Sequence, residues 1–143
     1  MPVTFSIRKS LGVFCAQFYG FVLIEDCLSS LQALAAHPDF RPNLNQLIDL
    51  SEVTDYERNF VRILEFFARM PESGFAPGQE FLVVYYAPAQ AGQELARIAI
   101  RSWEGVPGPV LRMVGDPDQA LAILGLSHVA LQDLHAAADG SRV

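Results

Sequence analysis

The chain has 143 residues, of which 51% are hydrophobic and 18% charged, and its formal net charge is −6. This length suits one domain with a sizeable core. The negative charge argues against general binding to nucleic acid or anionic lipid, because both need a basic surface. The mean hydropathy of +0.24 is high, so we expect apolar surface that a homo-oligomer or another protein partner covers.

The first part of the chain predicts a hairpin and then a helix. Polarity alternates over residues 3–8 and again over 13–19, with Gly12 in the turn between them. Such alternation is typical of two antiparallel strands. Apolar residues at helical spacing then run over 24–35 and stop before Pro38. An amphipathic helix is therefore expected there.

Strand and helix patterns alternate through the rest of the chain. Strands are expected at 47–50, 81–86 and 110–114, and each is followed by apolar residues spaced as in a helix. The last of these helices should begin with Asp116 as N-cap and Pro117 at its first position. Alternating strands and helices require parallel pairing with right-handed crossovers. The sequence thus predicts an α/β fold, β-β-α-β-α-β-α-β-α, with a five-stranded, mostly parallel sheet and one antiparallel strand.

We assign residues 1–126 to a single domain and residues 127–143 to a C-terminal tail that can add a short helix. The N-terminal residues lack the pattern of a secretory signal. The longest apolar run, 81–87, is far below the roughly 18 residues that a spanning helix needs. We therefore expect a cytoplasmic protein without a membrane span. Cys15 and Cys27 lie among apolar neighbours and are expected in the core.

A candidate ligand site follows from residues 46–55, where an apolar run stops at an acid and hydroxyl side chains follow. The pattern predicts a buried strand that runs into a helix. In open α/β sheets, ligands bind beyond the carboxyl ends of strands, where helix N-termini offer free N–H groups. The candidate ligand-binding residues are Asp49, Ser51, Thr54, Tyr86 and Gln90. A purely structural role for Ser51 and Thr54, as turn or cap residues, is the competing interpretation.

The segment 60–70 predicts a helix with a wide apolar face. Its inward series is Phe60, Ile63, Leu64, Phe67 and Met70, and Arg58, Arg62, Glu65 and Arg69 lie opposite. Two further apolar residues flank this series, and Trp103 offers a large ring with one polar tip. Such a face either meets a partner, walls a pocket for an amphipathic ligand, or belongs to the core. The candidate interaction face is Val61, Phe66 and Trp103.

Patterns typical of catalysis are missing from the sequence. The three histidines, His37, His128 and His135, lack the spacing of a metal motif. No serine has the glycine neighbours of a nucleophile elbow, and no phosphate-binding loop is found. We therefore expect no metal, no cofactor and no enzymatic activity.

The order of elements, together with Asp49-Leu50-Ser51-Glu52-Val53-Thr54, resembles the SpoIIAA-like fold of STAS domains, which occur in anti-sigma-factor antagonists and in sulphate transporter tails. The resemblance covers residues 3–125. Gly20 and the stretches 34–40, 94–97 and 116–125 are similar to the small bacterial proteins called STAS/SEC14-like or SpoIIAA-like.

The resemblance implies three functions. In antagonists, a kinase phosphorylates a serine in an Asp-Ser-Ser-Gly-like turn, but the aligned residues 57–60 hold no acceptor. Ser51 and Thr54 are then the candidate phosphoacceptors for such a switch. We expect instead a non-catalytic STAS-like module for protein interaction or regulation. The alternative, which the SEC14-like name implies, is a protein that binds a small amphipathic or lipid-like ligand.

Overall fold

One mixed sheet forms the centre of the computed structural model, which describes residues 3–42, 44–69, 80–135 and 141–142. Neighbouring strands follow the order β5 (Pro109–Val114), β4 (Phe81–Tyr86), β3 (Asn45–Tyr56), β2 (Val13–Val22), β1 (Val3–Arg8) and β6 (Ser141–Arg142). Strands β2 to β5 are parallel, whereas β1 is antiparallel to β2 and to β6. This confirms the predicted sheet, to which β6 adds a short edge strand.

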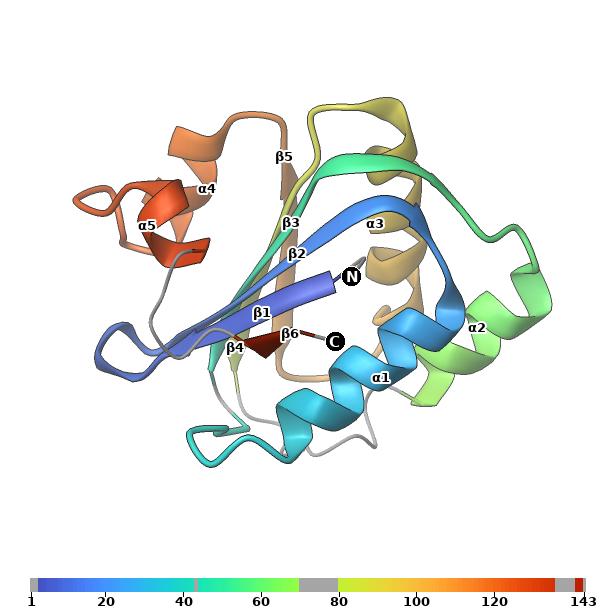
Figure 1. Cartoon of the computed structure of the whole chain (residues 1–143), viewed down its shortest axis with the longest axis horizontal. Coiled ribbons are helices and arrows are strands. Elements are labelled where there is room, and N and C mark those ends of the chain that lie inside the picture. Colours follow the sequence, from blue (N-terminus) through green and yellow to red (C-terminus); the bar gives the residue numbers. More distant parts are fainter. Residues whose placement is uncertain (1–2, 43, 70–79, 136–140, 143) are drawn as a thin grey trace.

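Helices cover both faces of this sheet (Figure 1). On one face lie α1 (Ile24–Ala35), α2 (Phe60–Arg69) and α3 (Gln90–Ser102), and on the other lie α4 (Pro117–Ile123) and α5 (Leu131–His135). The α/β fold class is therefore confirmed. The start of α4 is as predicted, since the Asp116 carboxylate accepts the backbone N–H of Asp118 at 2.8 Å and Pro117 follows it.

Strand β3 is much longer than the sequence predicts. It continues past Leu50 to Tyr56, because β2 extends to Val22 and pairs with it along the whole length. Two register shifts in this pairing, after Gln17 and after Gly20, absorb the mismatch between the strands. The prediction that a helix begins near Ser51 and Thr54 is therefore wrong, since the sheet partner outweighs the weak local preference of these residues.

Helix α2 is turned about its axis relative to the prediction. Ile63 and Phe66 are buried in the core, whereas Leu64, which the sequence places inward, is 60% exposed. The Arg62 side chain is 41% exposed and lies near Glu57 (3.2 Å) and Glu25 of α1 (3.9 Å). The burial of Ile63 and Phe66 in the core sets that orientation, and these partly exposed ion pairs add little to it. The side chains of Phe67 and Arg69, and all of Met70, lie outside the part that the structure describes.

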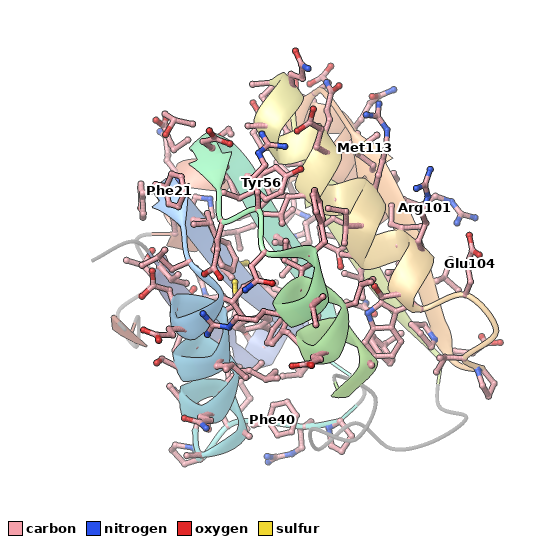
Figure 2. The ribbon with its side chains drawn as sticks, turned by 90° about the vertical axis from the view of Figure 1, so that its right-hand side faces the viewer. Phe21, Phe40, Tyr56, Arg101, Glu104 and Met113 are labelled. Atoms are coloured by element: carbon pink, nitrogen blue, oxygen red, sulfur yellow. The ribbon has the colours of Figure 1, made fainter. Side chains whose placement is uncertain are left out.

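Figure 2 shows the face that α1, α2 and α3 cover, with Tyr56 at the end of β3 beside α3. The Tyr56 hydroxyl donates to Glu94 of α3 at 3.2 Å, and the Arg58 guanidinium lies 4.3 Å from the centre of the Tyr56 ring. Closer to the sheet, α3 touches β3 at Gly92. A Cβ atom at Gly92 would lie 2.9 Å from the carbonyl oxygen of Leu50. The absence of a side chain there lets the helix rest directly on the sheet.

Residues 127–135 pack on the domain rather than extending from it. Leu134 of α5 is fully buried in a cluster with Val13, Cys15 and Leu47. The Ser6 hydroxyl of β1 also donates to the Leu134 carbonyl at 3.0 Å. Among the described residues, no helix is both long and apolar enough to cross a membrane.

Candidate functional site

Asp49 is a buried carboxylate in the middle of β3, facing α5. Its side chain is 2% exposed and accepts three hydrogen bonds. The donors are the Ser51 backbone N–H (2.9 Å), the Ser51 hydroxyl (2.6 Å) and Nε2 of His135 (2.8 Å). An ionised carboxylate can only accept, so His135 carries a proton on Nε2. The cluster ties the strand to the helix across 86 residues of sequence.

The hydrogen bonds keep Asp49 ionised. Burial by itself raises the pKa of this carboxyl, but the bonds from His135 and Ser51 and the proximity of the imidazole outweigh that effect. The pKa of Asp49 therefore lies below its ordinary value. Nearby, burial and then the negative charge of Asp49 raise the pKa of Tyr86, so its phenol stays neutral.

A broad polar cleft of about 890 Å³ lies beside this cluster, on the α4 and α5 side of the sheet. Its polar walls are Gln17, Asp49, Ser51, Tyr86, Asp118, Ser127, His128, Gln132 and His135. A serine nucleophile needs a base that takes its proton, whereas the Ser51 hydroxyl donates to a carboxylate that is already paired. The cluster thus holds α5 in place. Phosphorylation of Ser51 would be unfavourable, because the phosphate would lie next to the buried negative charge of Asp49.

The five predicted ligand-binding residues do not form one site. Asp49, Ser51 and Tyr86 line the polar cleft together. Thr54 is exposed on the long β3 strand, away from any helix start. Gln90 is exposed at the start of α3 and donates to Glu94 at 3.3 Å. Thr54 is separated from the other candidates because β3 continues beyond the predicted strand end.

Sequence reasoning missed His135, because its partner is distant in the chain and the tail carried no motif. It also missed an apolar cavity on the opposite face of the sheet, beneath α1, α2 and α3. This cavity measures about 100 Å³. Its walls are Phe14, Ala16, Phe18, Cys27, Ser30, Leu31, Leu34, Gln46, Ile48, Leu50, Phe66, Tyr85, Leu95 and Ala99.

Two polar groups in the cavity wall have no partner among the described residues. Gln46 and Tyr85 are each 6% exposed, yet neither the amide nor the hydroxyl makes a hydrogen bond to that part of the chain. Every fully buried side-chain N or O atom that the structure describes is paired. The two groups therefore retain some accessible surface, and both residues line the cavity. The sequence does contain a signal for Gln46. It lies at every second position with Ile48 and Leu50, which places the three side chains on one face of the strand.

The predicted interaction face is divided between core and surface. Phe66 and Trp103 are buried in the core, where Trp103 packs edge-on against Phe81 at 6.3 Å between ring centres. Val61 is 66% exposed. Exposed large apolar residues include Phe60, Val61 and Leu64 of α2, with Phe21 at the end of β2 and Leu23 between β2 and α1. Figure 2 shows Phe21 at this end of the sheet.

Burial disfavours the thiolate form of both cysteines. Burial raises the pKa of Cys15 to about 12, and burial likewise raises the pKa of Cys27 to about 12. A nucleophilic cysteine needs the opposite shift. Among the described residues, no three His, Cys, Asp or Glu side chains gather to hold a metal ion.

The arrangement of strands and helices is that of the SpoIIAA-like fold. The chain resembles an uncharacterised protein of the DUF3478 family from Shewanella loihica PV-4, whose crystal structure has a SpoIIAA-like fold. The TM-score is 0.54 at 17% sequence identity, over 85% of this chain and 93% of that chain. This confirms the fold that the sequence resemblance implies. No family description and no curated protein matches the chain by sequence.

Proposed function

We propose that this protein is a non-catalytic binding module, which holds a small, largely apolar molecule in the cavity beneath α1, α2 and α3. The observation that carries this proposal is the cavity itself, which measures about 100 Å³ and has a mostly apolar lining between the sheet and α1, α2 and α3. Protein interiors contain few voids larger than a water molecule.

The size and lining of the cavity define the ligand class. A purely apolar cavity of about 150 Å³ takes up a benzene molecule, so this cavity suits a ligand, or part of one, on the scale of a single ring. Aromatic and aliphatic side chains from β2, α1, β3, α2 and α3 provide the walls. Binding would replace lost dispersion contacts and thereby stabilise the folded protein.

Toluene is a suitable probe. Its binding can be monitored by the changes in amide NMR shifts of the protein during a titration. We expect saturable shifts at residues around the cavity and a higher melting temperature. The variant Ala16→Leu fills the cavity and should abolish both effects. The same change at an exposed position of α1, Ala35→Leu, should leave both effects unchanged. The absence of saturable shifts up to the solubility limit of toluene would reject the proposal.

A second candidate function is binding to an apolar protein surface, including that of a second copy of this chain. The specific observation is the exposure of Phe60, Val61 and Leu64 on one helix. Exposed apolar groups of this kind mark interaction sites when they gather on one surface. The oligomeric state of variants at these exposed residues of α2 tests this candidate.

A further inference from the structure

Two polar residues line the cavity from neighbouring strands. Gln46 lies on β3 and Tyr85 on β4, and the two strands are paired in parallel, with Gln46 beside Val83 and Ile48 beside Tyr85. Both residues line the cavity from the floor of the sheet. Neither polar group is paired within the described residues, although each residue is 6% exposed. A buried amide or hydroxyl without a partner costs free energy, so such groups are normally satisfied.

From this juxtaposition we propose that the ligand carries one uncharged hydrogen-bonding head group, which the Gln46 amide and the Tyr85 hydroxyl hold. This inference rests on the proposed function and specifies the ligand of the same cavity. The Gln46 amide can both donate and accept, and so can the Tyr85 hydroxyl. A hydroxyl, carbonyl or carboxamide on an apolar body matches this pair.

The charge of the lining excludes an ionic head group from the proposal. The described residues around the cavity include no Lys, Arg, His, Asp or Glu. A charged ligand group would lose its hydration and gain no opposite charge. Two further polar lining residues contribute little, since the Ser30 hydroxyl already donates to the Asp26 carbonyl at 3.1 Å and Cys27 holds a neutral thiol.

Toluene and phenol test the head group, because they differ mainly in a methyl and a hydroxyl. The quantity to measure is the ratio of their dissociation constants, by NMR titration, in the wild type and in the variants Gln46→Leu and Tyr85→Phe. We expect each variant to weaken phenol relative to toluene by about tenfold. The comparison of ratios removes the different hydration of the two probes.

Matched controls lie on the opposite face of the same sheet. Gln17→Leu and Tyr86→Phe make the same chemical changes at residues that line the polar cleft. They should leave the ratio as in the wild type. Benzoate, a charged probe, should not bind in the cavity of the wild type.

The outcomes separate the two proposals. If neither toluene nor phenol binds the wild type, the proposed function fails and this inference fails with it. If both bind, and the ratio is the same in wild type, Gln46→Leu and Tyr85→Phe, the cavity stands and the head-group assignment is overturned. Tighter binding of benzoate than of phenol would also overturn it. Toluene binding by each variant serves as the check that its cavity is intact.

Discussion

Asp49 shows how a single residue acquires a role that its sequence position does not reveal. The local sequence identified it as the acid that interrupts an apolar strand, and the structure places it against α5 with His135 and Ser51 as donors. The acid itself could be singled out from the pattern of residues 46–55. Its partner could not, because only the packing of the C-terminal segment on β1 and β2 brings His135 to the strand.

The low pKa of Asp49 predicts loss of stability in acid. A carboxyl whose folded pKa is below its unfolded value of about 3.9 stabilises the protein above that pH and loses this contribution as pH falls through the folded value. Asp49→Asn should lower the free energy of unfolding at pH 6 by about 1.5–3 kcal/mol. Urea unfolding should show this difference shrinking below about pH 4.

The control for this experiment is Asp55→Asn on the same strand. Asp55 pairs with Arg58 at 2.9 Å, but both side chains are about half exposed. Solvent screens such a pair, so the change should have little effect on unfolding. If Asp55→Asn destabilised the protein as much as Asp49→Asn, or if the Asp49→Asn difference were independent of pH, the assigned role of Asp49 would be wrong.

At the scale of elements, patterns of apolar residues located most helices and strands, but not their lengths or rotations. Strand β4 and the start of α4 follow the prediction, since their own residues decide them. Strand β3 and the inward face of α2 do not, because pairing with β2 extends the strand and the packing of Ile63 and Phe66 in the core orients the helix. Such interactions between elements cannot be read from a local window of sequence.

The contact between α3 and β3 gives a prediction of unusual sign. Inside a helix, replacing glycine with alanine is favourable by about 1 kcal/mol. At Gly92 the new Cβ would lie 2.9 Å from a backbone oxygen of Leu50, which cannot move easily. We expect Gly92→Ala to destabilise the protein by about 1–3 kcal/mol in urea unfolding.

Arg97→Ala, at an exposed position of the same helix, is the comparison for Gly92→Ala. It should change the free energy of unfolding by no more than about 0.5 kcal/mol. A Gly92→Ala protein that is more stable than the wild type would show that α3 does not rest on β3 as described.

For the molecule as a whole, the SpoIIAA-like fold could be predicted from the order of elements and the resemblance of residues 49–54. The location of the candidate site could not. The sequence pointed to the strand ends, whereas the cavity is lined from the body of the sheet, where the pairing of β3 with β4 places Gln46 and Tyr85 on neighbouring strands. An isolated amide in an apolar strand is ambiguous until its neighbours are known.

The exposed residues of α2 predict self-association at the molecular scale. If a second copy covers them, Val61→Glu combined with Leu64→Glu should convert an oligomer into a monomer in sedimentation experiments at tens of micromolar protein. Ile123→Glu on α4, another exposed apolar residue, should leave the oligomer intact. A wild-type protein that sediments as a monomer at these concentrations would remove the second copy as the partner.

Strand β3 sends Gln46 into the cavity on one face and Asp49 toward α5 on the other. Side chains alternate between the two faces of a strand. A shift of β3 by one residue would therefore turn the Asp49 carboxylate toward the apolar cavity and the Gln46 amide away from it. The irregular pairing with β2 begins only after Gln17 and Asp49. Insertions and deletions are thus better tolerated in β3 after Asp49. The regular pairing of residues 46–49 keeps Gln46 and Asp49 on their two faces of the sheet.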